Sequence, residues 1–197
     1  MPDKRTIAVY DTNASEYVRC LAAPETYPKL ESFIDAMPPG GHVLDLGCGP
    51  GTWAGRMMER GLKVDALDAS EGMAALAWER FGLKVRIGTF DAVTGSAVYD
   101  GIWAHYSLLH APREAMPGHL AALRRALKPS GRMLIALKLG DGARRDKLGR
   151  FYTYYSAPEL NDLLAEARFD VIERATGQDV GFDGSAHDWI AVTVHPR

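Results

Sequence analysis

Three glycines at alternating positions are the feature of this sequence best suited to binding a ligand. Gly47, Gly49 and Gly51 follow an apolar segment, residues 42–46, and precede a helix-prone segment, residues 52–60. Glycine allows positive φ and a close approach of the backbone, and the free N–H groups at a helix start attract negative charge. The loop therefore predicts a site for an anionic or carbonyl-rich ligand, the alternative being a tight structural turn.

Two histidines supply groups that titrate near neutral pH. His105 follows an apolar segment, residues 99–104, and His110 comes five residues later. Either is a candidate general base if it faces a ligand, and the alternative for each is an ordinary hydrogen bond within a loop. Their spacing matches no metal-binding motif, so we predict no metal site.

Short apolar segments alternate with helix-prone segments from residue 42 onward, which predicts an α/β fold whose sheet is parallel and covered by helices on both faces. Ligands bind outside the carboxyl ends of such strands. No helix separates the last two strands, so they are predicted to pair antiparallel. Residues 128–131 are predicted to form a turn, and Ser156 with Glu159 a capping box. The predicted strands are 42–46, 63–67, 84–87, 99–104, 132–139, 171–174 and 189–194, and the predicted helices are 52–60, 71–81, one ending at 127 and one after 156.

The length of 197 residues suits one domain. We predict a single domain over residues 1–197, with a helical cap at 1–40 and the sheet-containing core at 41–197. Two short helices are expected within residues 10–37, broken by Pro24 and Pro28, before a Pro-Pro-Gly-Gly stop.

Charge and composition narrow the function classes. The net charge is −2, and 47% of the residues are hydrophobic. This balance disfavours a strongly basic nucleic-acid or membrane binder. There is no apolar run long enough to span a membrane and no signal peptide pattern. With only two cysteines, we expect no disulfide framework and a cytoplasmic location.

The segment VLDLGCGPG, residues 43–51, resembles motif I of the class I S-adenosylmethionine-dependent methyltransferases. The resemblance covers residues 41–139 best. It implies a Rossmann-like, doubly wound sheet of seven strands, mostly parallel with an antiparallel last strand, and S-adenosylmethionine as cofactor. A dinucleotide fingerprint would place its third glycine at Thr52, so a nicotinamide oxidoreductase is the weaker interpretation.

The resemblance also implies roles for individual residues. Asp68 would accept hydrogen bonds from the ribose hydroxyls, and Asp91 would accept one from the adenine amino group. Met73 would pack on the adenine, and Tyr10 and Tyr17 would cover the cofactor. The alternatives are an N-cap of the next helix for Asp68, a turn-forming role for Asp91, and simple packing for Met73, Tyr10 and Tyr17. The cofactor-binding set that we predict is Tyr10, Tyr17, Asp45, Gly47, Cys48, Gly49, Gly51, Asp68, Ala69, Met73, Phe90, Asp91, Ala104 and His105.

The methyl acceptor is predicted to lie beside His105 and His110. Five basic residues between 138 and 150 are followed by an aromatic run, which would suit an anionic or aromatic acceptor, although a solvated basic loop explains the charges equally simply. Residues 177–188 are expected to form a surface hairpin rather than a rim. A small-molecule acceptor is favoured over nucleic acid; a macromolecular acceptor and a cofactor-binding regulator without turnover are the alternatives, and the oligomeric state stays open. The acceptor-binding residues that we predict are Tyr106, Arg144, Arg145, Tyr152, Tyr154 and Tyr155.

Overall fold

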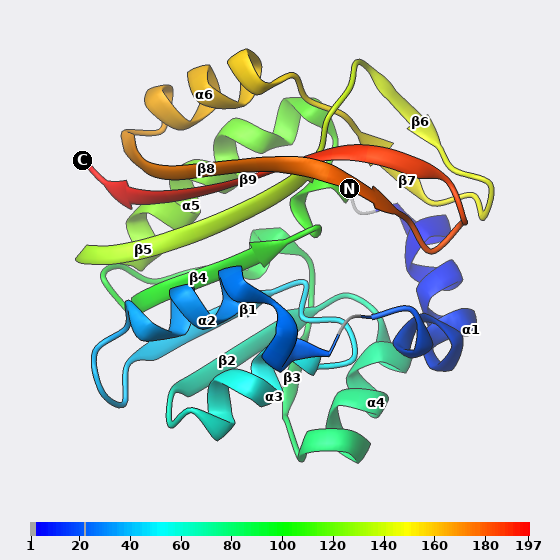
Figure 1. Ribbon diagram of the computed structural model, residues 1–197, viewed down its shortest axis with the longest axis horizontal. Coiled ribbons are helices and arrows are strands. Elements are labelled where there is room, and N and C mark those ends of the chain that lie inside the picture. The colour runs from blue at the N-terminus through cyan, green and yellow to red at the C-terminus, as the bar shows by residue number, and fades with distance from the viewer. Residues whose placement is uncertain (1–2, 22) are drawn as a thin grey trace.

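The computed structural model describes residues 3–21 and 23–197 and contains a seven-stranded sheet in the order β3-β2-β1-β4-β5-β9-β8 (Figure 1). Strand β9 runs antiparallel to both of its neighbours, and the remaining neighbouring pairs are parallel. This arrangement confirms the predicted fold class. The strands are β1 (His42–Leu46), β2 (Lys63–Asp68), β3 (Val85–Ile87), β4 (Tyr99–His105), β5 (Leu127–Lys138), β8 (Phe169–Val180) and β9 (Ala186–Pro196).

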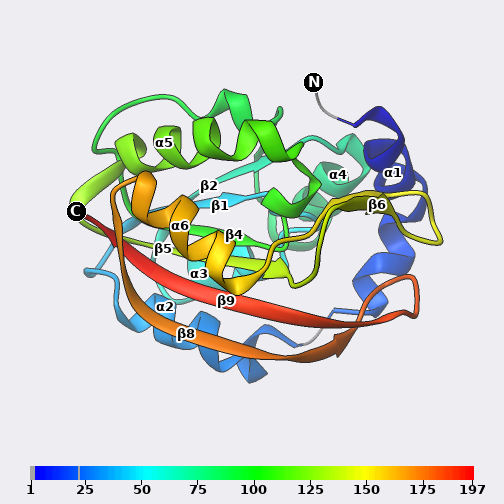
Figure 2. The same cartoon turned by 90° about the horizontal axis from the view of Figure 1, so that it is seen from above.

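Helices cover both faces of this sheet (Figure 2). One face carries α2 (Pro28–Asp35), α3 (Thr52–Glu59) and α4 (Glu71–Phe81). The other carries α5 (Met116–Ala126) and α6 (Ala157–Glu166). Helix α6 begins at the predicted capping box, with both of its reciprocal hydrogen bonds present.

Successive side chains of a central strand point to opposite faces of the sheet. The buried core is therefore divided between the two layers of helices. Leu44 and Ile102 face the α5–α6 side, whereas Val43 and Trp103 face the α2–α3 side. All four are buried, because a central parallel strand is covered on both faces. The Trp103 ring packs on Phe33 of α2 with the ring centroids 5.2 Å apart. Helix α2 therefore packs directly on one face of the sheet.

Helix α1 (Lys4–Arg19) lies at the end of the sheet, close to the tip of the β8–β9 hairpin (Figure 1). It is fixed to the start of α4 by Asp11, whose Oδ1 accepts hydrogen bonds from Ser70 Oγ at 2.6 Å and from the Gly72 N–H at 3.0 Å. A short 3₁₀ turn (Pro24–Thr26) then leads into α2. Residues 1, 2 and 22 of the predicted cap lie outside the described part of the chain.

Several predicted boundaries are wrong. Strand β5 includes residues 128–131, predicted as a turn, because β5 accommodates them as an irregularity opposite Tyr99 and Gly101. Strands β8 and β9 extend well past their predicted ends and continue as a two-stranded ribbon beyond β5. The predicted loop after β5 contains a small antiparallel pair, β6 (Ala143–Arg145) and β7 (Phe151–Thr153). No helix within residues 3–21 and 23–197 is long and apolar enough to cross a membrane.

Candidate active site

A cavity of about 340 Å³ lies beyond the carboxyl ends of the parallel strands. Its floor is formed by the loops that follow β1, β2, β3 and β4, and α1 and the β8–β9 turn contribute to its other walls. This is where the sheet topology places ligands. The predicted residues that line the cavity are Tyr10, Tyr17, Gly47, Cys48, Gly49, Asp68, Ala69, Met73, Phe90, Asp91, His105, Tyr106, His110 and Tyr152.

The glycine loop, residues 47–51, forms part of the cavity floor. Gly47 has φ 72° and its N–H donates to the Leu67 carbonyl at 2.7 Å, which joins the β1 and β2 ends. A Cβ on Gly47 would stand 2.4 Å from the Cβ of Ser107, so the loops after β1 and β4 touch only because residue 47 is glycine. Gly49 has φ 54° and open space where a Cβ would stand. A ligand can therefore approach the backbone of this loop.

Asp68 ends β2 and is held by the same loop. Its Oδ2 accepts the Gly49 N–H at 2.8 Å and its Oδ1 accepts the Ser70 N–H at 2.9 Å. Burial raises the pKa of Asp68, and these backbone donors act in the opposite direction. Each carboxylate oxygen retains acceptor capacity on the cavity side, which is what a pair of ribose hydroxyls requires.

Three predicted cofactor-binding residues lie behind the cavity wall instead of lining it. Gly51, with φ 76°, is the N-cap of α3, and Ala104 is fully buried within β4. Asp45 is 1% exposed beneath the glycine loop, and its Oδ2 lacks a hydrogen-bond partner. Burial, with a further contribution from Asp68, raises the pKa of Asp45 to about 8. This shift favours the protonated form of the buried Asp45 carboxyl at neutral pH, although the Ala54 N–H acts in the opposite direction.

A chain of hydrogen bonds connects His110 to a buried ion pair. The His110 Nδ1 lies 2.6 Å from the Phe151 carbonyl and therefore donates, which leaves Nε2 to accept from the Tyr10 hydroxyl at 2.9 Å. The same hydroxyl accepts from Arg150 Nη1 at 3.0 Å. Arg150 is 2% exposed, and its Nε donates to Asp146 Oδ2 at 2.8 Å. Three segments distant in sequence are thus joined at the cavity wall.

His105 occupies the centre of an aromatic cluster. Its ring stacks on Trp103 with a centroid separation of 5.2 Å, and its Nε2 lies 2.9 Å from the Tyr27 hydroxyl. Trp53, in the first turn of α3, packs edge-on against the same imidazole at 5.4 Å. Tyr27 and Trp53 line the cavity, and sequence reasoning did not find them because aromatic residues in helical segments normally signal core packing.

Burial makes both histidines weak bases. It lowers the pKa of His105 to about 3 and that of His110 to about 4, although the Phe151 carbonyl acts in the opposite direction on His110. Both imidazoles are neutral at pH 7, and each has a nitrogen already bonded to a tyrosine. The two histidine–tyrosine pairs are therefore better suited to positioning and enclosing a reactant than to removing a proton from it.

Four predicted acceptor-binding residues do not line the cavity. Strand β6 is the exposed outer strand of the small hairpin, so Arg144 stacks on Tyr154 at 3.8 Å and Arg145 pairs with Asp3 at 2.7 Å. Tyr155 is buried in the core on the α5–α6 side. Of the five basic residues in this region, Lys138 and Arg150 line the cavity and the other three do not.

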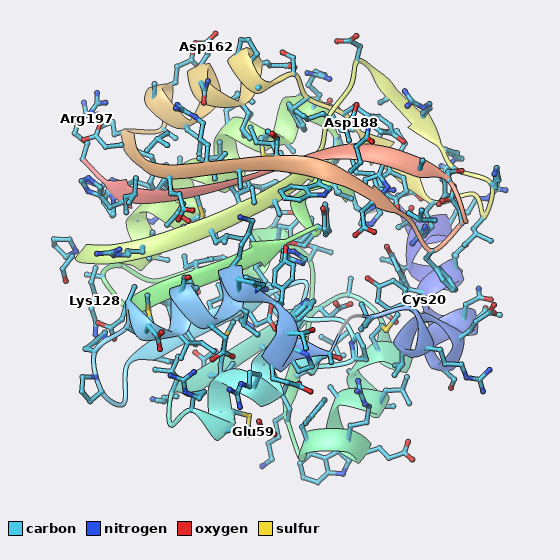
Figure 3. All side chains as sticks on the ribbon, viewed as in Figure 1. Cys20, Glu59, Lys128, Asp162, Asp188 and Arg197 are labelled. Carbon is cyan, nitrogen blue, oxygen red and sulfur yellow. The ribbon has the colours of Figure 1, made fainter. Side chains whose placement is uncertain are left out.

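The β8–β9 turn supplies a wall that was not expected. Gly181, Phe182 and His187 line the cavity, so residues 177–188 form both a hairpin and a rim. The Phe182 ring packs edge-on against Tyr17 of α1 at 5.4 Å. Cys20, which also lines the cavity, lies at the end of α1, at the opposite side of the molecule from Lys128 (Figure 3). Within residues 3–21 and 23–197, no cluster of histidine, cysteine and acidic side chains could hold a metal ion.

Comparison with known proteins gives a consistent result. Residues 43–131 match the family model described as "Methyltransferase domain". The solved structure of a 1,6-didemethyltoxoflavin-N1-methyltransferase from Burkholderia thailandensis, with S-adenosylhomocysteine bound, is 25% identical and superposes with a TM-score of 0.74 over 96% of this chain and 88% of that one.

Two curated relatives differ in the share of their own length that aligns with this chain. An uncharacterized methyltransferase of Staphylococcus carnosus is 28% identical over 68% of this chain and 65% of its own length. A tRNA (carboxymethyluridine(34)-5-O)-methyltransferase of Mus musculus is 28% identical over 68% of this chain and 20% of its own length. The chain thus spans less than two thirds of these relatives.

Proposed function

We propose that this chain is a class I S-adenosylmethionine-dependent methyltransferase that methylates a small molecule bound beside the cofactor, as the matching methyltransferase domain model and the Burkholderia relative support. The observation that carries the proposal is the cavity of about 340 Å³, which one set of loops and α1 surround. The cavity is lined by the residues predicted to bind the cofactor and also by aromatic and basic residues that have no predicted role.

The cofactor is proposed to lie along the loops after β1, β2 and β3. The backbone of Gly47 and Gly49 would support its methionine and ribose parts, and Asp68 would accept from the ribose hydroxyls. Met73 is buried with its side chain at the cavity, where it suits an adenine face. Asp91 is exposed at the cavity edge, where it can accept from an amino group.

When bound, the cofactor supplies an electrophilic methyl group on a sulfonium: the acceptor's lone pair forms the new bond to carbon, and the carbon–sulfur electron pair stays on sulfur. The protein's task is to hold the acceptor in line and to exclude water. The His105–Tyr27 and His110–Tyr10 pairs are proposed to form the rigid floor and wall for this step. Burial lowers the pKa of both histidines, so neither is a strong base, which favours an acceptor that is nucleophilic without losing a proton to the protein.

A small acceptor is favoured by the walls of the site. Tyr17 of α1 packs on Phe182 of the β8–β9 turn, so the two segments meet at the cavity. The Burkholderia relative is named for a small heterocyclic acceptor and the mouse relative for a tRNA, so both classes occur among similar proteins. This contact narrows the space around the cavity, which favours a small acceptor.

Calorimetry and an acceptor screen test the proposal. We expect the protein to bind S-adenosylmethionine and S-adenosylhomocysteine but not NAD, and to release S-adenosylhomocysteine when a mixture of small metabolites is added. Turnover with an RNA or protein fraction and not with small molecules would assign a macromolecular acceptor. Tight cofactor binding without turnover on any fraction would assign a regulatory role, and binding of NAD in preference to either nucleoside would contradict the proposal altogether.

A further inference from the structure

Lys138, the last residue of β5, is buried but faces the cavity. The residue is 8% exposed and lines the cavity, and its Nζ lies 4.5 Å from the centroid of the Tyr152 ring. An aromatic face attracts an ammonium group but does not neutralise it. Burial lowers the pKa of Lys138, as expected when an ammonium loses water without gaining a full counter-charge.

A second cation faces the same ring, and it is already neutralised. The Arg150 Cζ lies 5.3 Å from the Tyr152 centroid. Its Nη2 lies 2.7 Å from Asp146 Oδ2, in addition to the hydrogen bond from Nε. Two buried cations therefore meet at Tyr152, but the one carboxylate in ion-pair contact with them belongs to Arg150.

Lys138 has no comparable partner. Among residues 3–21 and 23–197, no carboxylate lies within 4.0 Å of its Nζ and no hydrogen bond from it is formed. The acids that face it from the β8–β9 turn are Asp179 and Asp183, and each accepts a backbone N–H group, from Val180 at 2.7 Å and from Ser185 at 3.1 Å. A buried ammonium in a ligand cavity is costly unless something pairs with it.

We propose that Lys138, backed by the Tyr152 ring, binds an oxyanion of the acceptor, and that the acceptor is therefore a small carboxylic acid. The assignment rests on the proposed function, because it takes the acceptor to occupy this cavity. A singly charged carboxylate fits better than a phosphate, since Arg150 is neutralised and the acids of the turn would repel a dianion. Tyr106 and Trp189, which also line the cavity, offer aromatic surface to the rest of the molecule.

The test uses the full-length protein saturated with S-adenosylhomocysteine. Binding of a panel of aliphatic and aromatic carboxylates, from acetate to benzoate and indole-3-acetate, is compared by calorimetry with binding of the matching primary amides. Phenylphosphonate serves as the dianionic probe. We expect at least one carboxylate to bind roughly 10-fold or more tightly than its amide, the range for hydrogen bonds to a charged group, and more tightly than phenylphosphonate.

The variants assign the preference to Lys138. Lys138→Met keeps the length of the side chain and should bring acid and amide within about 2-fold of each other, whereas Lys138→Arg should retain the preference. The control is Lys147→Met, because Lys147 is exposed in the turn between β6 and β7 and does not line the cavity. It should behave as the unmodified protein.

Three outcomes would overturn the inference. No carboxylate binding more tightly than its amide would show that the cavity does not select an acid, and a preference for phenylphosphonate would assign a phosphorus oxyanion. If Lys138→Met weakens binding of S-adenosylhomocysteine but not of 5′-methylthioadenosine, which lacks the amino-acid part, Lys138 binds the cofactor's carboxylate instead. Failure of the unmodified protein to bind S-adenosylhomocysteine would contradict the proposed function itself, and so is distinct from all three.

Discussion

The Tyr10 hydroxyl lies 2.9 Å from Nε2 of His110, so a hydrogen bond inside the cavity wall joins the first helix to the loop after β4. The Phe151 carbonyl fixes the tautomer of His110, and Arg150 donates to the same tyrosine oxygen. Helix α1 is therefore fixed to the site by a buried polar network, in addition to its contact with α4.

Tyr10→Phe is expected to destabilise the protein by about 1–3 kcal/mol. The change removes the donor to His110 and the acceptor for Arg150, which leaves two buried polar groups unpaired. Urea unfolding measures the loss. Tyr17→Phe is the matched control, because Tyr17 lies in the same helix and its hydroxyl makes no hydrogen bond to the described residues. Equal losses in the two variants would show that the network contributes nothing particular.

Asp68→Ala is expected to weaken binding of S-adenosylhomocysteine by about 1.5–3 kcal/mol, the range for hydrogen bonds to a charged group. Calorimetry measures the change, and circular dichroism checks that the variant stays folded. Asp162→Ala, at an exposed position on α6, should leave the affinity unchanged (Figure 3). If Asp68→Ala unfolds the chain while the folded fraction keeps its affinity, Asp68 has a structural role and not a binding role.

Gly47→Ala is expected to destabilise the protein by about 1–3 kcal/mol, because its Cβ would stand 2.4 Å from that of Ser107 at a φ of 72°. Thermal or urea unfolding measures this. Gly118→Ala should have the opposite effect, a gain of about 0.5–1 kcal/mol, since Gly118 lies in α5 with open space at its Cβ position. A neutral result at residue 47 would mean that the two loops can separate at no cost.

Asp45→Asn should stabilise the protein increasingly as the pH rises. The folded state holds the Asp45 proton with a pKa of about 8, whereas the unfolded chain releases it near 3.8. Between these pH values the unfolded state binds fewer protons than the folded state. The free energy of unfolding of the unmodified protein therefore falls by up to about 1.4 kcal/mol for each pH unit, and that of the variant does not. Urea unfolding at pH 5, 6 and 7 measures the difference.

Asp162→Asn is the control for this series, because its exposed carboxylate is solvated in both states. Parallel stability curves for the unmodified protein and Asp45→Asn would show that Asp45 is ionised in the folded protein and that its burial is compensated.

The sequence by itself determined the features that depend on neighbouring residues. Strand and helix alternation predicted the parallel sheet, and the glycine spacing at 47–51 predicted the loop that lines the cavity. These follow from local periodicity and from the conformational freedom of glycine, so no tertiary information was needed.

Tertiary structure decided which charges and aromatic rings face the cavity. Arg144, Arg145, Lys138 and Arg150 look alike in the sequence, but β6 turns the first two to the surface while the other two meet at Tyr152. Phe182 reaches the site because the β8–β9 ribbon extends beyond the end of β5. The direction of a side chain in a loop is set by the strand pairing of distant segments, and that information is not contained in the spacing of residues along the chain.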